Sequence, residues 1–224
     1  MTEPNKPLDQ MTVQERLGLG VSYLGEGRFD EAIKALSSIH REEAAPETYA
    51  WAQFSLGAAY NESGKLDDAI TAWSNIHRDD NPKTYAWAQF SLGAAYYAQE
   101  DWEQAIKTWS NISHDDDPET YAQAQLNLGN TYDDLGKLEQ AIETWSNISH
   151  DDNPETYAWA QLNLGLAYKN QDELGQAIET WSNISHDDNP ETYAWAQLNL
   201  GLAYKNQDEL GQAIETWSNI SHDD

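Results

Sequence analysis

The sequence predicts an all-α solenoid of six antiparallel helix-turn-helix repeats of about 36 residues. The phrase "P-[EK]-T-Y-A" returns at a constant interval of 36 residues, and its copies begin at Pro46, Pro82, Pro118, Pro154 and Pro190. The last two copies, residues 154–188 and 190–224, are identical. Within a copy, apolar residues follow the 3.6-residue period of a helix. A fixed period of this length with helical patterning indicates stacked repeats.

The first helix of each repeat, called helix A, has recognisable signals at both ends. In the fifth copy, Asn153 supplies an N-cap side chain and Pro154 occupies the first helical position. We expect the helix to end close to Asp172, because related copies have Gly64 and Gly136 at that position. Glycine there is typical of a left-handed C-terminal cap.

The second helix, called helix B, is expected from about Glu173 to Ser185. Its apolar residues lie at i, i+3, i+4, i+7 and i+10, and those expected to be buried are Leu174, Ala177, Ile178, Trp181 and Ile184. A hairpin of two such helices cannot cover its own apolar face, so each repeat must stack on its neighbours.

The repeats account for nearly the whole chain. A diverged copy, "RLGLGVSYLGEGRFDEAIKALSSI", precedes the regular ones at residues 16–39. We therefore expect a polar leader, residues 1–12, and one repeat domain, residues 13–224. The six expected repeats cover residues 13–49, 50–85, 86–121, 122–157, 158–193 and 194–224.

One string of residues in each repeat resembles a known family. Leu164, Gly165 and Tyr168 form "L-G-x-x-Y". Ala177 and Trp181 follow as "A-x3-[FW]", with a proline at the next junction. This pattern resembles the tetratricopeptide repeat (TPR). The resemblance implies a right-handed superhelix in which helix A lines the concave wall, helix B forms the outside, and the groove binds other proteins.

Two features depart from the TPR pattern. The period is 36 residues here, whereas about 34 is usual. The first aromatic residue of the family signature is replaced by glutamine, at Gln53, Gln89, Gln125, Gln161 and Gln197. The Sel1-like repeat, which also has 36 residues and an "A-x-x-x-L-G-x-x-Y" string, is the alternative. The Gly-rich insertion expected between its helices is missing.

Composition excludes several classes of function. The chain has 39 Asp and Glu against 12 Lys and Arg, a formal charge of −27, and no cysteine. Such an acidic chain repels nucleic acid and anionic lipid surfaces. Disulfides and Cys-based metal sites are excluded. The start "MTEPNKPLDQ" has no apolar signal-peptide core, and no apolar run of 18 residues follows. We expect a soluble cytoplasmic protein with neither nucleic acid nor membrane as a partner.

Helix A carries a second apolar face, opposite the packing face that contains Leu164 and Gly165. The resemblance to the TPR family implies that this face, called the groove arc, lies on the concave side. The expected partner-binding residues on the arc are Trp51, Phe54, Trp87, Phe90, Gln123, Leu126, Asn130, Trp159, Leu162, Leu166, Lys169, Trp195, Leu198, Leu202 and Lys205. Ala58 and Ala94 take the third arc position in the second and third repeats.

Two interpretations of the arc tryptophans remain open. They can form a groove for an extended or helical peptide, because aromatic residues are common binding anchors. Alternatively, each tryptophan packs partly on the next repeat. Most acidic residues lie at helix ends, on helix B or in loops, so a partner with hydrophobic anchors and basic flanks would fit. The excess of acidic residues is equally explained by solubility alone.

A second hypothesis is end-to-end self-assembly into a homo-oligomer. The chain stops at "SHDD" without a polar capping helix. Leu210, Ile214 and Trp217 would then present an uncovered stacking face. Three interpretations of this face remain open: contact with the N-terminal repeat of another copy, contact with a second C-terminus, and continuation of the natural chain.

Catalytic and metal chemistry is not expected. No nucleophile, paired carboxylates or phosphate-binding loop stands out from the repeat. All histidines lie at the repeat junctions, close to acidic residues: His40, His77, His114, His150, His186 and His222. This arrangement is a conceivable cation ladder, but favourable charge at the end of helix B and capping of the next helix A explain it more simply. The sequence therefore predicts no cofactor, no metal and no enzyme.

Overall fold

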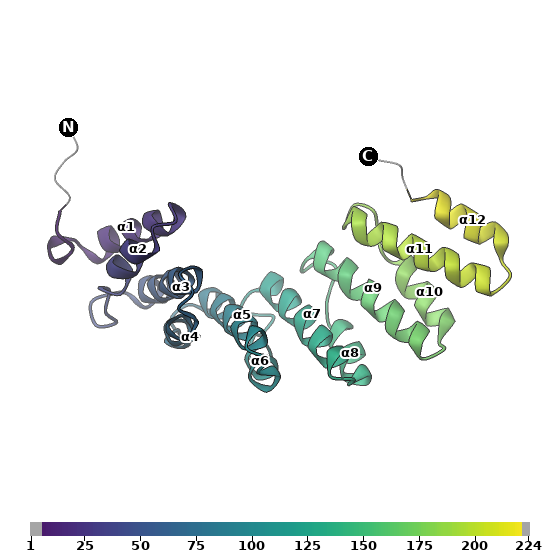
Figure 1. Cartoon of the computed structure of the whole chain (residues 1–224), viewed down its shortest axis with the longest axis horizontal. Coiled ribbons are helices and arrows are strands. Elements are labelled where there is room, and N and C mark those ends of the chain that lie inside the picture. Colours follow the sequence, from purple (N-terminus) through teal and green to yellow (C-terminus); the bar gives the residue numbers. More distant parts are fainter. Residues whose placement is uncertain (1–5, 221–224) are drawn as a thin grey trace. The chain divides into compact units, whose positions relative to one another are not determined.

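The computed structural model describes residues 6–220, and within that range the regular structure is entirely helical (Figure 1). A short 3-10 helix, η1, precedes twelve α-helices. The elements are η1 (Leu8–Gln10), α1 (Val13–Gly25), α2 (Phe29–Leu36), α3 (Pro46–Glu62), α4 (Leu66–Ser74), α5 (Pro82–Ala98), α6 (Trp102–Trp109), α7 (Pro118–Asp134), α8 (Leu138–Trp145), α9 (Pro154–Asn170), α10 (Leu174–Ser182), α11 (Pro190–Asn206) and α12 (Leu210–Ser218).

The helices pair as helix-turn-helix repeats, with the odd-numbered helices as helix A and the even-numbered ones as helix B. The chain therefore has the all-α repeat fold that the sequence predicts. The expected repeat borders 49/50, 85/86, 121/122, 157/158 and 193/194 fall inside A helices. A repeat taken from its proline keeps both helices intact, and the repeats are numbered 1 to 6 on that basis below.

The helix ends follow the local signals. Asn153 is the N-cap of α9, and its side-chain oxygen accepts a hydrogen bond of 2.8 Å from the Thr156 backbone N–H. Helix α10 ends at Ser182, so the expected end at Ser185 was wrong by three residues. The backbone turns after Asn183, where the Ile184 N–H donates to the Trp181 carbonyl, and this turn brings Ile184 back into the core.

The turn between helices A and B uses the left-handed backbone conformation. Glycine adopts it at Gly64 and Gly136, with φ of 75° and 69°. Repeats 5 and 6 have Asp172 and Asp208 there, with φ of 63° and 65°, and repeat 3 has Glu100 at 61°. The predicted left-handed cap is thus present even where the residue is not glycine, at the steric cost that a Cβ imposes.

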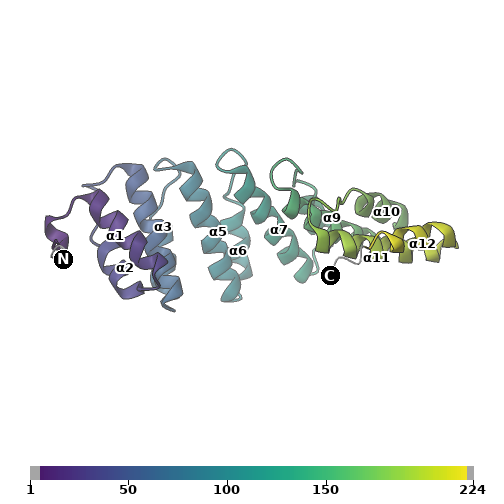
Figure 2. The same cartoon turned by 90° about the horizontal axis from the view of Figure 1, so that it is seen from above.

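Two compact units divide the chain, Met1–Thr120 (unit 1) and Tyr121–Asp224 (unit 2), and the division falls inside α7. The sequence predicts one repeat domain, so the division is an addition to that picture. In unit 1, α1, α3 and α5 lie side by side (Figure 2), and the core between repeats 2 and 3 contains Trp73 and Leu92. In unit 2, α9 and α11 are in contact, around a core that includes Trp181 and Leu200.

Across residues 6–220, no helix combines the length and apolar character needed to cross a membrane.

Candidate functional site

In unit 1, three aromatic residues of the expected groove arc contact one another. Trp51 and Phe54 project from α3 and Trp87 from α5. The ring centroids are 5.6 Å apart for Trp51 and Phe54, and 5.8 Å apart for both remaining pairs. All three side chains are half-buried. These residues, called the aromatic cluster, therefore contact the neighbouring repeat and still present ring surface to solvent.

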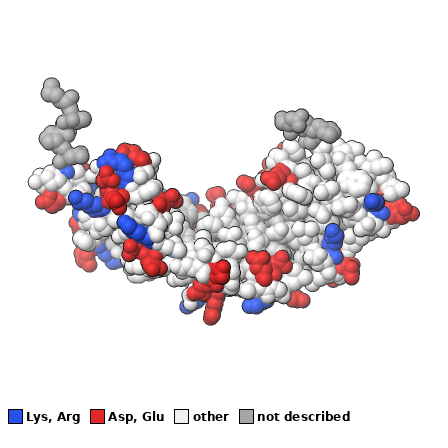
Figure 3. Space-filling view, in the orientation of Figure 1, with Lys and Arg blue, Asp and Glu red and all other residues white. Residues whose placement is uncertain are grey.

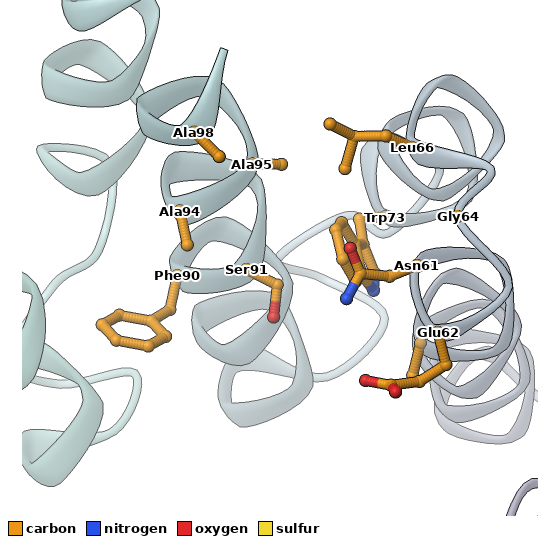
Figure 4. A pocket seen from close by; sticks show the side chains of 11 residues that line it. Asn61, Glu62, Gly64, Leu66, Trp73, Phe90, Ser91, Ala94, Ala95 and Ala98 are labelled. Atoms are coloured by element: carbon orange, nitrogen blue, oxygen red, sulfur yellow. The ribbon is translucent and has the colours of Figure 1, made fainter. Parts of the chain in front are cut away.

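A pocket lies further along the same two helices, α3 and α5 (Figure 4). Its volume is about 550 Å³. The lining residues are Ala58, Asn61, Glu62, Gly64, Leu66, Trp73, Phe90, Ser91, Ala94, Ala95 and Ala98. The arc residues Ala58, Phe90 and Ala94 are among them, so the pocket continues the arc beyond the aromatic cluster. Sequence reasoning missed it, although alanine at the third arc position was the available signal.

One wall of the pocket is held rigidly. The Trp73 indole lies so close to Gly57 that a Cβ on this glycine would overlap the ring. The indole Nε1 donates a hydrogen bond of 3.2 Å to the Phe54 carbonyl oxygen. Trp73 is 4% exposed. Close packing and this hydrogen bond together fix the ring, so the pocket wall is preformed.

The polar side chains of the pocket come from both helices. Asn61 and Glu62 extend from α3 into the gap between the helices, and Ser91 extends from α5 (Figure 4). Glu62 is exposed, and its carboxylate makes no hydrogen bond or ion pair with the described residues. No Lys or Arg lines the pocket. The nearby Lys65 amine pairs instead with Asp30, at 3.4 Å.

In unit 2, part of the expected groove arc lies in the core. Leu162 is only 6% exposed and packs with Ala196 and Leu200 of α11. The expectation that Leu162 faces a partner was therefore wrong. Helix α9 contacts both its own B helix, α10, and the next A helix, α11. The contact with α11 covers the side of α9 on which Leu162 lies. Trp159 and Leu166 are half-buried against the same core.

The corresponding residues of α11 are exposed. Trp195, Leu198 and Leu202 are 50%, 38% and 40% exposed, and their spacing places them along one side of the helix. Lys205 on α11 and Lys169 on α9 are exposed as well. Figure 3 shows a largely uncharged surface over this part of unit 2.

The arc residues of α7 are engaged within unit 2. The Asn130 side-chain oxygen accepts hydrogen bonds from Trp145 Nε1, at 3.2 Å, and from Asn163 Nδ2, at 2.9 Å. Asn130 thus serves as an internal acceptor, a role that the sequence did not indicate. Leu126 packs against the core between repeats 4 and 5, and Gln123 is half-buried.

Ion pairs connect successive repeat junctions. Arg41 contacts Asp80 with N–O distances of 2.6 and 2.9 Å. His150 Nε2 lies 2.8 Å from Asp188 Oδ1 at the equivalent position of unit 2. The Arg41 guanidinium holds the pKa of the Asp80 carboxyl below its usual value. Arg41 and His150 therefore each contact an aspartate of the next junction, a link between repeats that the sequence did not show.

Neither the junctions nor the rest of residues 6–220 bring three His, Asp or Glu side chains together in a way that could hold a metal ion. His222 lies outside the described residues.

The expected stacking face is exposed in part. Leu210 and Ile214 on α12 are 55% and 64% exposed. Trp217 differs, because its indole packs against Gly201 of its own repeat and donates a hydrogen bond of 3.4 Å to the Leu198 carbonyl. Only Leu210 and Ile214, called the α12 face, are therefore strongly exposed among the three residues.

Solved structures resemble the chain in fold. The crystal structure of MamA has 23% identity and a TM-score of 0.56, over 74% of this chain and 92% of that one. A tetratricopeptide repeat protein from Parabacteroides merdae has 17% identity and a TM-score of 0.60, over 93% and 78%. MamA from Desulfovibrio magneticus, from residue 41 to its end, has 17% identity and a TM-score of 0.53, over 76% and 92%.

No curated protein matches the sequence. A family model does, and its description is "T7SS, ESX-1 secretion system protein EccA1, N-terminal domain". The match covers residues 14–218, from α1 to the end of α12. With its paired-helix repeats and its TPR structural neighbours, the chain belongs to this EccA1 N-terminal domain family and has the TPR fold.

Proposed function

We propose that the protein is a non-enzymatic scaffold that binds a peptide segment of another protein on the groove arc. The observation that carries the proposal is the aromatic cluster of Trp51, Phe54 and Trp87, whose rings remain partly exposed. Repeat 4 has Gln123 at the tryptophan position and forms the same helix pair. Because the repeat folds without an aromatic residue there, the tryptophans are available for recognition.

The cluster has the properties of a binding anchor. Its rings contact one another at 5.6 to 5.8 Å, so they are ordered before any partner arrives. A preordered aromatic surface loses little side-chain entropy on binding. Large aromatic side chains also bury much apolar area per contact, which explains their frequency at binding hot spots. We therefore expect a peptide whose apolar side chains pack on these rings.

Selection of peptides from a random displayed library tests the proposal. The informative variant is Trp51→Gln combined with Trp87→Gln, which copies the residue that repeat 4 already has. Affinity for a selected peptide should fall at least tenfold, or about 1.4 kcal/mol, by fluorescence anisotropy. Far-UV circular dichroism should show unchanged helix content.

The matched control is Trp102→Gln, which removes a tryptophan from the B helix α6. This variant should bind the selected peptide as the unmodified protein does. Unchanged affinity in the double variant of the cluster would reject the groove arc as the binding surface.

The α12 face supports a second candidate function, self-association. Helices α10 and α12 have identical sequences. In α10, Leu174 and Ile178 are half-buried against the core that includes α11. Their counterparts Leu210 and Ile214 are the most exposed large apolar side chains of the described chain. A helix A of a second copy is a candidate cover for this face.

Light scattering across a concentration series tests this second candidate. The measured mass should grow with concentration, and Ile214→Glu should suppress the growth. The control Gln212→Glu adds the same charge two residues away, on the other side of α12. A constant monomer mass at high concentration would reject self-association.

A further inference from the structure

We infer that the pocket between α3 and α5 selects a peptide containing a large apolar residue close to a Lys or Arg. The inference rests on the proposed peptide-binding function and specifies its partner. The apolar side chain would enter the pocket, and the basic side chain would pair with Glu62. Three observations lead to this inference: the small residues that create the pocket, its preformed wall and its unpaired carboxylate.

The pocket exists because of a residue difference between repeats. Ala58 and Ala94 occupy the third arc position in repeats 2 and 3. Repeats 5 and 6 have Leu166 and Leu202 at that position. A leucine at position 94 would extend into the space that the pocket occupies, since Ala94 lines it. Unit 1 therefore has the smaller side chain at this position and unit 2 the larger one.

The interior of the pocket favours an apolar side chain. Most of its lining is Leu66, Trp73, Phe90 and alanine side chains. Figure 4 shows Leu66 and Trp73 on the α3 side of the space, whereas the Phe90 ring points away from them. The volume of about 550 Å³ falls in the range of pockets that bind ligands in proteins. Because hydrogen bonding and packing against Gly57 fix the Trp73 ring, the wall needs no rearrangement to receive a guest. Preformed apolar pockets of this kind anchor large aliphatic or aromatic side chains.

The mouth of the pocket favours a cation. The Glu62 carboxylate is exposed and has no ion pair with any described residue. The nearest basic residue in the sequence, Lys65, is paired with Asp30. The formal charge of −27 also attracts basic segments from a distance and raises their association rate. A Lys or Arg next to the anchoring residue thus gains a direct partner and long-range attraction.

The acidic charge of the chain also favours one of two candidate occupants of the pocket, a second copy of this chain or a segment of a different protein. A second copy of this chain has only 12 Lys and Arg against 39 Asp and Glu, so it offers the Glu62 carboxylate few basic segments. A basic segment of a different protein meets complementary charge instead. We therefore assign the pocket to a heterologous peptide.

A random dodecapeptide library, displayed on phage and selected against the full chain, tests the inference. Selected peptides should combine a large apolar residue with a Lys or Arg within about three positions. In a sample with isotope-labelled alanine methyl groups, a selected peptide should shift the resonances of Ala58 and Ala94. Enrichment of apolar residues without basic ones would overturn the assignment of Glu62.

Two variants separate the roles of pocket and carboxylate. Ala94→Leu copies repeats 5 and 6, so it should fold, and it should weaken a selected peptide at least tenfold. Glu62→Gln should keep the apolar preference, remove the preference for Lys or Arg, and reduce the salt dependence of binding. The controls Leu135→Ala and Glu179→Gln make matching changes at exposed positions of unit 2 outside the groove arc, and they should leave affinity unchanged.

The outcomes distinguish this inference from the proposed function. Peptides that depend on Trp51 and Trp87 but bind Ala94→Leu normally would overturn the pocket inference and leave the scaffold proposal standing. Failure of the library to yield any peptide that binds the chain would overturn both.

Discussion

The repeat depends on close contact between a glycine of helix A and a tryptophan of helix B. Trp181 is fully buried, and its indole Nε1 donates to the Leu162 carbonyl at 3.2 Å. A Cβ on Gly165 would overlap the indole atoms. The same contact joins Gly57 to Trp73 in repeat 2. Glycine is therefore needed here for close approach, although it weakens the helix that contains it.

Two glycine substitutions in repeat 5 should have opposite effects on stability. Gly165→Ala should lower the free energy of unfolding by about 1–3 kcal/mol, because the indole must shift in a packed core. Gly175→Ala should raise it by about 0.5–1 kcal/mol, since no atom lies within 4 Å and alanine favours the helix. Urea titrations followed by circular dichroism measure both. If both variants shift the urea midpoint in the same direction, the close contact between Gly165 and Trp181 does not determine the effect of an added methyl group.

At the left-handed turn, replacing a side chain by glycine should raise stability, and replacing glycine by a side chain should lower it. Glu100 holds φ of 61°, where a side chain costs about 1 kcal/mol. Glu100→Gly should therefore raise the melting temperature, and Gly136→Glu should lower it, since Gly136 holds φ of 69°. No atom within 4 Å opposes a Cβ at Gly136, so backbone conformation alone accounts for the effect. A melting temperature unaffected by Gly136→Glu would contradict this explanation.

Within the elements, the junction loops combine capping with ion pairing. The Asp80 carboxylate accepts a hydrogen bond of 2.9 Å from the His77 backbone N–H and pairs with Arg41. Asn81, the next residue, caps α5 through a bond of 2.8 Å from the Thr84 N–H. In unit 2, His150 takes the position of Arg41 and contacts Asp188. The loops between B and A helices are therefore held in place from one repeat to the next.

The Asp80 pair should make unit 1 sensitive to acid. Its carboxyl pKa is lowered in the folded chain by Arg41, so its contribution is present above the unfolded pKa of about 3.9. That contribution is lost as pH falls through the folded pKa. Asp80→Asn should cost about 1–3 kcal/mol at pH 7, because a buried charged hydrogen bond is removed. Below pH 4, the stability of the Asp80→Asn variant should fall less steeply with pH than that of the unmodified protein.

Urea midpoints between pH 2.5 and pH 7 measure this effect. Asp79→Asn is the control, since Asp79 is exposed and should change the midpoint little at any pH. Parallel pH profiles for Asp80→Asn and the unmodified protein would contradict a role for the Arg41 pair.

At the scale of the whole molecule, the sequence was informative wherever the signal lies within one repeat. Asn153, Pro154 and the glycine at the turn predict the ends of helix A, because capping and left-handed backbone are local. The burial of Ala177 and Trp181 follows from helical periodicity and is confirmed. The repeat period then extends these local results to all six repeats.

The sequence was less informative where two repeats act together. Leu162 is buried by α11, a contact that the periodicity of one helix does not reveal. The pocket depends on alanine at position 94 together with the neighbouring helix α3. The Arg41–Asp80 pair joins residues in successive junctions. In each case the missing information was the distance between repeats, which no single repeat encodes.

Net charge should control the stability of the whole chain. Thirty-nine acidic residues face only 12 basic ones, and self-repulsion of this kind destabilises the compact state. Raising NaCl from about 10 mM to 0.5 M shortens the Debye length from roughly 30 Å to under 8 Å. We expect the melting temperature to rise by several degrees over this range. Salt also screens the junction pairs, but the buried Asp80 carboxylate is screened less than exposed acids.

A variant with fewer acids tests the source of this salt effect. Glu143→Gln, Glu179→Gln and Glu215→Gln together remove three exposed charges from B helices. Since less repulsion remains to be screened, the triple variant should melt higher at low salt and gain less from added NaCl. Thermal melts at four salt concentrations compare the two proteins. If the melting temperature of the unmodified chain falls with salt, favourable ion pairs contribute more to stability than the repulsion removes. That result would contradict the prediction.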